Sequence, residues 1–327
     1  MKNLELAPIV LFTYNRPLHT SQLLDSLAAN TLAKESVLYV FCDGVKANVS
    51  DQILEKIKKV RNIIKNENRF KKVIITIHEH NLGLANSVIK GVTTVINKYN
   101  KVIVLEDDLI LSPFFLQYMN DSLNRYDDNF SVGQIGACNF FACGEKYPDY
   151  FFVSIPDCWG WATWRNRWEH FKSNIEELEE ELNKDKNKIK IFNAYDSFDF
   201  MNMLNQQKLG KINSWAIRWQ AVCVLKGWLT LYPNPSMSNH IESDEATHAN
   251  KNIMPPLCLN LPIFKSVKVI EIKSVIKALK LGYSGKGNYF GKLKRPSLKK
   301  RIKKIIKIFI PLFFTDYLKK LKKWLKL

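Results

Sequence analysis

Three consecutive carboxylates, Glu106, Asp107 and Asp108, follow a short run of apolar and β-branched residues at 102–105. The length of this run and its valine and isoleucine content predict a buried strand. Three like charges at the end of a buried strand are costly unless a positive group binds there. Mg²⁺ or Mn²⁺ is a natural partner, because such ions often take one or two protein carboxylates and fill their other positions with substrate phosphates. A solvated acidic turn before the next helix is the alternative interpretation.

The elements that must position these carboxylates alternate between strand and helix patterns. Predicted strands cover 8–13, 37–42, 73–78 and 102–105, and helical patterns follow the first three near Pro17, Ile53 and Leu84. This order predicts an open, mostly parallel α/β sheet with helices on both faces. Ligands bind at the carboxyl ends of the strands in such sheets.

The carboxyl ends of the predicted strands carry other polar side chains besides the three carboxylates. They are Tyr14, Asn15 and Arg16 after the first strand, Asp43 after the second, and the residues 78–81 after the third. A cation, hydrogen-bonding groups and a carboxylate cluster at one edge suit a nucleoside diphosphate bound through a metal ion. Neither a GxGxxG nor a GxxxxGK[ST] motif is present, so neither the dinucleotide fingerprint nor the phosphate loop supports a different nucleotide enzyme.

Several segments together resemble a family, the glycosyltransferases of the GT-A fold. PIVLFTYNRP, FCDG, NLGLANSVIKG and VIVLEDDLILSPFFLQYMN look like the nucleotide-sugar half of such an enzyme. EDDL, followed by a proline and an aromatic pair, is similar to the metal motif of N-acetylglucosaminyltransferase I. CWGWATWRNRW, NSWAIRW and NHIESDEATH look like segments of bacterial transferases of surface polysaccharide assembly. The resemblance covers residues 7–250 and implies a GT-A-like fold.

The resemblance also implies a role for each polar group at the sheet edge. Asp43 would hold the nucleotide base and Arg16 the diphosphate. Asp107 would hold the ribose, Asp108 the metal, and Glu106 would face the donor sugar. Together with the neighbouring tyrosine and asparagine, these residues form the expected donor site.

A second polar cluster lies at 239–248, NHIESDEATH, and offers carboxylates for a general base and histidines for a metal. The resemblance implies that a late histidine completes the metal shell, and His248 is the expected one. Where N-acetylglucosaminyltransferase I has an aspartate after a tryptophan, this chain has Ala216, so the base cannot be carried over. The candidates for the base are, in order, Asp244, Glu242 and Asp157. A loop of ordinary solvated charges is the alternative.

Seven of the eight tryptophans lie between Trp159 and Trp228. Indole rings are large core fillers, so most of these side chains are expected to pack in the interior. A flat indole face also suits a sugar ring, and one or two of them could contact the donor or the acceptor.

The excess positive charge is confined to the end of the chain. Residues 265–327 carry 20 Lys and Arg and only 2 acidic residues, which equals the whole net charge of +18, whereas 1–264 carry 29 of each sign. Residues 298–327 place apolar and basic side chains at helical spacing, with Trp324 and Tyr317 among the apolar ones. This pattern predicts basic amphipathic helices on an anionic membrane surface. Packing on the core or a partner, and nucleic-acid binding, are the alternatives, and the large apolar face disfavours nucleic acid.

The sequence therefore predicts three regions. Residues 1–130 form the nucleotide-sugar-binding half, 131–264 the acceptor-binding and catalytic half of the same domain, and 265–327 a linker with the membrane-associating helices. The six cysteines form no CxxC pair and are expected to be reduced thiols, as in the cytosol. The N-terminus lacks a secretion signal pattern, and the apolar stretch 308–314 is too short to span a bilayer.

These observations predict a metal-dependent glycosyltransferase, peripheral on the cytoplasmic face of a bacterial membrane. It would use Mn²⁺ or Mg²⁺ to move a sugar from a nucleotide sugar, UDP-linked by expectation, to a lipid-linked glycan in surface polysaccharide synthesis, and by resemblance it would invert the anomeric centre. A sugar nucleotidyltransferase is one alternative, but it needs a glycine-rich loop after the first strand, where this chain has TYNRPLHT. A catalytically inactive, membrane-associated scaffold with the same fold is the other.

Overall fold

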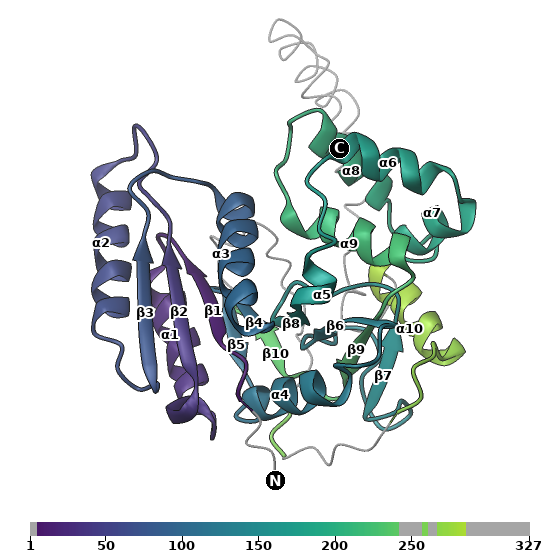
Figure 1. Ribbon diagram of the computed structural model, residues 1–327, viewed down its shortest axis with the longest axis horizontal. Coiled ribbons are helices and arrows are strands. Elements are labelled where there is room, and N and C mark those ends of the chain that lie inside the picture. Colours follow the sequence, from purple (N-terminus) through teal and green to yellow (C-terminus); the bar gives the residue numbers. More distant parts are fainter. Residues whose placement is uncertain (1–4, 242–256, 261–266, 286–327) are drawn as a thin grey trace, which may run out of the picture. The chain divides into compact units, whose positions relative to one another are not determined.

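The computed structural model describes residues 5–241, 257–260 and 267–285, all within one compact unit that spans 1–291. Its centre is an eight-stranded sheet with the order β3-β2-β1-β4-β8-β6-β9-β7 (Figure 1). The first four of these are β1 (Ile9–Thr13), β2 (Val37–Cys42), β3 (Lys72–Ile77) and β4 (Lys101–Glu106). They pair in parallel throughout, which confirms the predicted strands of the N-terminal half.

The direction of strand addition reverses at β1. The chain first adds β2 and β3 on one side of β1 and then returns to place β4 on the other side. The crossovers contain the helices α1 (Pro17–Ala28), α2 (Asp51–Lys65) and α3 (Leu84–Tyr99), with the short 3₁₀ turn η1 (Ala33–Glu35) after α1. Such a reversal opens a crevice between the carboxyl ends of the two central strands, which is where ligands bind in open α/β sheets.

Alternate residues of each parallel strand enter opposite cores. Ile9 and Leu11 pack in the cluster that also takes side chains from α1, α2 and α4 (Phe115–Arg125). Val10 and Phe12 pack in the cluster on the other face, covered by α3 and α9 (Trp215–Lys226). The inner strands β1, β2 and β4 are therefore buried on both sides, as their nearly continuous apolar sequences predict, whereas β3 at the edge is only partly buried.

The second half of the sheet is mixed. β8 (Trp161–Trp164) runs antiparallel to both β4 and β6 (Val132–Gly136), β6 is parallel to β9 (Leu229–Pro233), and β7 (Tyr150–Val153) closes the edge. The remaining helices on this side are α5 (Arg165–Trp168), α6 (Ile175–Asn183), α7 (Lys186–Phe192) and α8 (Phe200–Lys208). The predicted fold class, a mostly parallel α/β sheet flanked by helices, is confirmed for the part of the chain that the structure describes.

Two short strands form a separate antiparallel ribbon beside the switch point. β5 (Leu109–Leu111) follows the three carboxylates directly, and β10 (Ser238–His240) pairs with it from far along the chain. The pairing sets His240 opposite Leu109, and the amide of Ile241 donates to the carbonyl of Asp108 at 2.7 Å. The ribbon therefore brings the start of the second polar segment next to the first.

The last described helix, α10 (Lys273–Tyr283), belongs to the folded unit. Its buried side chains Val275 and Leu279 pack in a third core cluster with β7. The folded unit therefore extends beyond residue 264, where the sequence placed its end. The predicted amphipathic helices at 298–327 lie outside the described residues.

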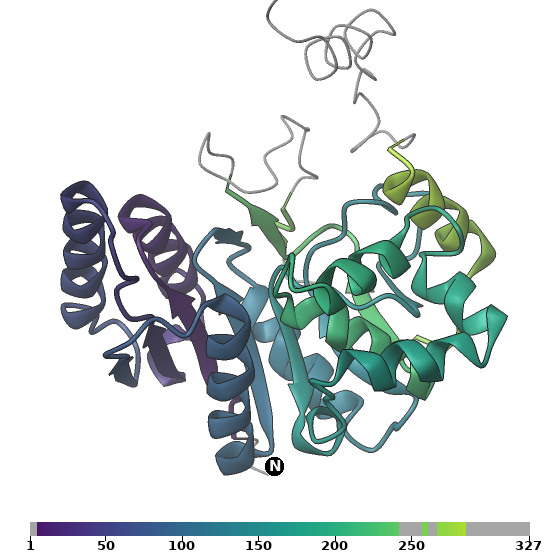
Figure 2. The ribbon, with the colours of Figure 1, turned by 90° about the horizontal axis from the view of Figure 1, so that it is seen from above.

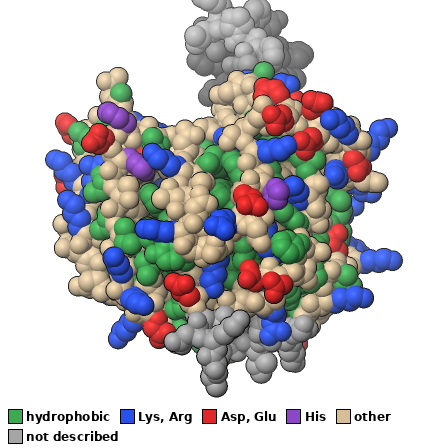
Figure 3. Space-filling model, in the orientation of Figure 1, with side chains coloured by type: hydrophobic (Ala, Val, Ile, Leu, Met, Phe, Trp, Pro, Cys, Tyr) green, Lys and Arg blue, Asp and Glu red, His purple; other side chains and the backbone are tan. Residues whose placement is uncertain are grey.

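Two further expectations concern cysteines and membrane spans. All six cysteines are free thiols, and four of them are buried. Among the helices of the described segments, none combines the length and the apolar character that crossing a bilayer requires. On the face drawn in Figure 3, acidic and basic side chains are interspersed over the folded unit.

Candidate functional site

A pocket of about 190 Å³ lies at the carboxyl ends of β1, β2 and β4. Its walls come from 12–16 after β1, from Phe41, Asp43 and Lys46 around the end of β2, from the start of α3 and from the end of β4. The rings of Phe12 and Phe41 stack with their centroids 5.6 Å apart. The pocket thus joins an apolar aromatic side to a polar rim, which is the usual make-up of a small-molecule site.

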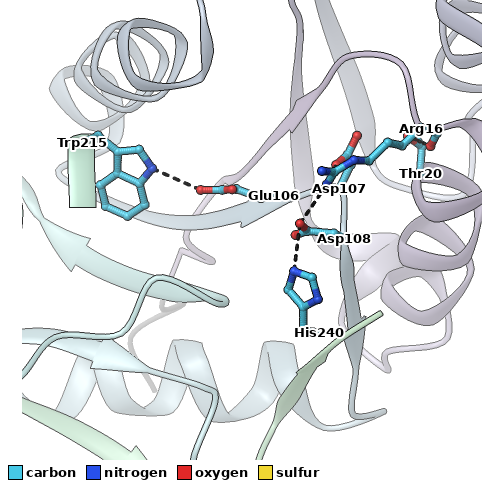
Figure 4. Close-up of polar contacts among 7 residues, drawn as sticks. All are labelled: Arg16, Thr20, Glu106, Asp107, Asp108, Trp215 and His240. Atoms are coloured by element: carbon cyan, nitrogen blue, oxygen red, sulfur yellow. Dashed lines mark hydrogen bonds and ion pairs between the residues drawn. The ribbon is translucent and has the colours of Figure 1, made fainter. Parts of the chain in front are cut away.

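Arg16 faces the carboxylates across the switch point (Figure 4). Its Nη1 lies 2.9 Å from Oδ2 of Asp108 and 3.7 Å from Oδ1 of Asp107. Arg16 occupies the N-cap position of α1, and its carbonyl accepts from the amide and the hydroxyl of Thr20 at 2.9 and 2.8 Å. The helix start therefore fixes the backbone of Arg16, while its long side chain crosses to the end of β4.

His240 approaches the same carboxylate from the β10 ribbon. Its Nε2 lies 3.0 Å from Oδ2 of Asp108, the oxygen that Arg16 also contacts. The imidazole is tilted against the half-buried ring of Trp159, with centroids 5.6 Å apart. Sequence reasoning considered the histidines of this segment but selected His248, so the structure adds His240 as a partner of Asp108.

The surroundings shift the acidities of the three carboxyls in different directions. Burial, reinforced by the charge of Asp108, raises the pKa of Glu106 to about 8 and that of Asp107 to about 7. Burial alone would also raise the pKa of Asp108, but the hydrogen bonds and charges of His240 and Arg16 lower it below its usual range. Asp108 is therefore the carboxylate that holds its negative charge at this edge.

Glu106 turns away from Arg16 toward the tryptophan-rich half (Figure 4). The indole Nε1 of Trp215, the first residue of α9, donates to Oε1 of Glu106 at 3.1 Å. Trp215 in turn stacks on Trp161 with centroids 5.1 Å apart. Since Glu106 also lines the pocket, it connects the pocket floor to the core of the second half.

Asp43 is saturated by donors from its own chain. One carboxylate oxygen accepts from the amides of Gly44 and Leu82 at 2.9 and 2.8 Å. The other accepts from the side chain of Asn81 at 2.9 Å and the amide of Gly83 at 3.0 Å. The expected contact of Asp43 with a nucleotide base stays a prediction, and the described geometry shows this carboxylate shaping the loop that forms the pocket wall.

Asp157, the third candidate for the base, is held by backbone amides. One of its oxygens accepts from the amides of Ala137 and Cys138 at 2.9 and 2.8 Å, and the other accepts from the amide of Trp159 at 3.0 Å. The residue is buried and is not among those that line the pocket, and burial raises its pKa to about 6. Asp157 thus holds the chain after β6 to the chain before β8, and its expected role as a base stays a prediction.

The other candidates of the second polar cluster, Glu242, Asp244 and His248, lie outside the described residues. Of the expected donor-site residues, six line the pocket: Tyr14, Asn15, Arg16, Asp43, Glu106 and Asp107. Asp108 lies beside them through its contact with Arg16. The structure thus brings together the groups from the ends of β1, β2 and β4 that the parallel sheet predicts.

The groups around Asp108 partly fit a divalent cation. A carboxylate oxygen and an imidazole nitrogen, those of Asp108 and His240, are donors that Mn²⁺ accepts. Within the described ranges, no three His, Cys, Asp or Glu side chains converge on one point. Among the described residues, Asp108 and His240 would hold such an ion, and its remaining positions would be open to further groups such as phosphate or water, which is typical of Mg²⁺ and Mn²⁺.

Most of the tryptophans are core residues, as expected. Trp161, Trp164, Trp168, Trp215, Trp219 and Trp228 are buried. Trp159 is half-buried beside His240, and Trp215 contacts Glu106, so these two lie nearest to the carboxylate cluster.

Neither a protein-family model nor a curated protein matches this chain. Among solved structures, two of S. aureus TarS match 44% of it at 20% sequence identity. The TM-scores are 0.28 for TarS and 0.29 for TarS 1–349, and the match spans 23% and 38% of those chains. A likeness of this size determines neither the activity nor the substrate of the chain.

Proposed function

We propose that the chain is a glycosyltransferase that takes its sugar from a nucleoside diphosphate sugar. The observation that carries this proposal is the meeting of Arg16, Asp107, Asp108 and His240 at the switch point, next to a pocket with stacked aromatic rings. A nucleoside diphosphate sugar presents a flat base, a ribose and a strongly anionic diphosphate in sequence. The pocket offers aromatic rings, hydrogen-bonding groups and cationic side chains, which suit these three parts.

Arg16 is the proposed partner of the donor diphosphate. A guanidinium offers several donors in a planar fork that matches phosphate oxygens, and it stays protonated at any physiological pH. Its present partners are Asp107 and Asp108 at the edge of the sheet, and a diphosphate can replace them because the arginine side chain is long and flexible. Asp107 is the proposed partner of the ribose, and Glu106 is proposed to face the donor sugar.

Asp108 and His240 are proposed to hold Mn²⁺ or Mg²⁺ together with the donor, and His248 stays the expected further ligand. A bound ion would supply Lewis-acid stabilisation of the leaving diphosphate. The low pKa of Asp108 keeps it ionised, so it is ready to hold a cation at neutral pH. Arg16, which contacts the same oxygen of Asp108 as His240 does, would add its positive charge to that of the ion beside the diphosphate.

The base is proposed to come from the second polar cluster, with Asp244 first and Glu242 second. The base would take the proton of an acceptor hydroxyl, whose oxygen would then attack the anomeric carbon and displace the nucleoside diphosphate. This single displacement would invert the anomeric centre, in line with the resemblance. β10 supports this assignment because it places His240, which comes two residues before Glu242 in the sequence, beside the carboxylate site.

The acceptor is proposed to be a lipid-linked glycan of surface polysaccharide synthesis, and the enzyme to act as a peripheral protein on the cytoplasmic face of the membrane. The basic amphipathic pattern of 298–327 supports this placement. Both parts of the proposal depend on the sequence pattern and the resemblance.

A thermal-shift screen of UDP-, GDP- and CMP-sugars with Mn²⁺ tests the donor. A ligand that binds only the native state raises the melting temperature by mass action, so a UDP-sugar with Mn²⁺ should give the largest shift. Absence of a shift with any nucleotide sugar would contradict the proposal.

Turnover then tests the base. Asp244→Asn should lower kcat by roughly 10²–10⁴-fold, the usual contribution of general acid–base catalysis, and should leave donor binding intact. Glu242→Gln serves as the matched variant. Wild-type kcat in Asp244→Asn together with a loss in Glu242→Gln would move the role to Glu242.

A further inference from the structure

The outer face of α10 is uniformly basic. Lys273, Lys277 and Lys280 are exposed and recur at helical spacing, so they lie along one side of the helix. No acidic residue occurs in α10. Within the described part of the chain, no ion pair or hydrogen bond engages their ammonium groups. The face therefore carries three uncompensated positive charges.

A hollow runs along this face between α10 and the turn after α7. It has a volume of about 500 Å³ and is lined by the three lysines, Ile276, Leu281, Ser284, Asp196 and Ser197. Asp196 is the one acidic side chain among these lining residues. The hollow thus combines net positive charge with two hydroxyl groups, a combination that suits phosphate oxygens.

Two large apolar side chains stand exposed at the C-terminal end of the same face. Leu281 is 41% exposed and Phe198 is 43% exposed. Phe198 follows Ser197, which lines the hollow, and its ring lies 6.2 Å from that of Tyr283 in the last turn of α10. Exposed leucine and phenylalanine next to lysines are typical of a surface that enters the interfacial layer of a bilayer.

The inner face fixes α10 to the folded unit. Val275 and Leu279 are fully buried, and a side chain at Gly282 would come within 2.9 Å of Phe141. Just before the helix, the carboxylate of Glu271 accepts from the amide and the hydroxyl of Ser154 at 2.8 and 2.9 Å, and also from the hydroxyl of Tyr195. The basic face is therefore presented in a defined orientation.

We propose that the outer face of α10, with Leu281 and Phe198, docks the folded unit on an anionic phospholipid surface. The lysines would meet lipid phosphates, and the two apolar side chains would enter the interfacial layer. Charge complementarity supports this occupant, and so does the chain that follows, since 286–327 carry 15 Lys and Arg and only 1 acidic residue. The proposal goes beyond the proposed glycosyl transfer, because it concerns a surface that contains no residue of the nucleotide pocket.

Figure 2 shows α10 at the margin of the described ribbon, toward the same upper side as β10, which carries His240.

Vesicle binding by the full-length protein tests the proposal. The triple variant K273E/K277E/K280E should raise the apparent Kd for vesicles of phosphatidylcholine and phosphatidylserine (3:1) about 100-fold, because each lysine near such a surface contributes roughly a fivefold factor. The matched control is K58E/K59E/K65E on α2, which makes the same charge change at exposed lysines on the opposite edge of the sheet. The control should stay within about threefold of the parent, and both variants should keep the parent's melting temperature and nucleotide binding.

Equal affinities of the two triple variants for these vesicles would overturn the proposal, because the effect would then be one of net charge alone. Parent-like affinity of the α10 variant would overturn it as well. Leu281→Ser separates insertion from charge: it should weaken the binding that remains in 0.5 M salt, where lysine charges are screened. Unchanged high-salt binding in Leu281→Ser would show that Leu281 does not enter the bilayer and would contradict the apolar part of the proposal.

Discussion

Two pairs of carboxylates, Asp43 with Asp157 and Asp107 with Asp108, differ in the groups that satisfy them. Asp43 and Asp157 accept hydrogen bonds mainly from backbone amides of neighbouring loops. Asp43 has four donors and Asp157 has three. Asp107 and Asp108 instead face Arg16, and Asp108 also faces His240. All four lie near strand ends of the same sheet. The first pair holds loops of the chain in place, whereas the second pair is free to exchange its partners for a ligand.

The type of hydrogen-bond donor distinguishes structural carboxylates from functional ones in this molecule. Backbone amides cannot leave their carboxylate without a change of the loop, so Asp43 and Asp157 hold the chain together. Long cationic side chains can exchange a carboxylate for a ligand, so the pair at Arg16 is available for binding. Loss of the first kind should cost stability, and loss of the second should cost activity.

Asp108→Asn should give the largest effect on turnover. The amide lacks the negative charge that holds a cation, so kcat should fall by about 10²–10³-fold, the usual cost of removing one preorganised electrostatic group. The free energy of unfolding should change little, because the side chain has movable partners. Parent-like turnover in the presence of Mn²⁺ would remove Asp108 from the site.

Asp157→Ala should act on stability instead. It leaves three amides without a partner in the interior, and the free energy of unfolding should fall by about 3 kcal/mol or more. Denaturant titration measures this, with the exposed Asp149→Ala as the control. If Asp157→Ala lost activity at full stability, the division between the two pairs of carboxylates would be wrong.

Arg16→Ala should weaken nucleoside diphosphate binding by about 10–100-fold, as expected for loss of a charge-assisted hydrogen bond. Arg16→Lys keeps the charge without the planar fork, so it should recover only part of the affinity. Calorimetric titration with UDP gives both numbers. Equal UDP affinity in Arg16→Ala and the parent would show that the guanidinium serves Asp108 alone.

Trp215→Phe should give the smallest effect. It keeps a ring against Trp161 but removes the hydrogen bond to Glu106, so the free energy of unfolding should fall by about 1 kcal/mol. A change in donor-sugar preference would show that this bond also orients Glu106. A loss of several kcal/mol would instead mean that the indole is needed for packing.

The parallel half of the fold could be predicted because local patterns determine it. Apolar runs, helical spacing and the alternation of the two place Arg16, Asp43 and the three carboxylates at one edge without any long-range information. The contact of His240 with Asp108 could not be predicted, since it depends on a pairing of two three-residue strands whose sequences carry no strong strand signal. β8 could not be predicted for a related reason: the sequence WATW indicates a cluster of core tryptophans and carries no clear strand pattern.

Asp157 and α10 show what sequence patterns conceal. In sequence, a carboxylate that accepts hydrogen bonds from three backbone amides cannot be told from one that faces a substrate. The lysines of α10 merge in sequence with the basic residues that follow, so the segment looked like part of a linker. The burial of Val275 and Leu279 shows that this helix belongs to the folded unit.

Calorimetric titration of UDP, with and without Mn²⁺, into the parent and Asp108→Asn tests the central claim most directly. If the edge at Arg16, Asp108 and His240 binds a metal-linked diphosphate, Mn²⁺ should tighten UDP binding at least tenfold in the parent and have little effect in Asp108→Asn. The same Mn²⁺ dependence in both proteins, or no UDP binding to the parent under either condition, would contradict it.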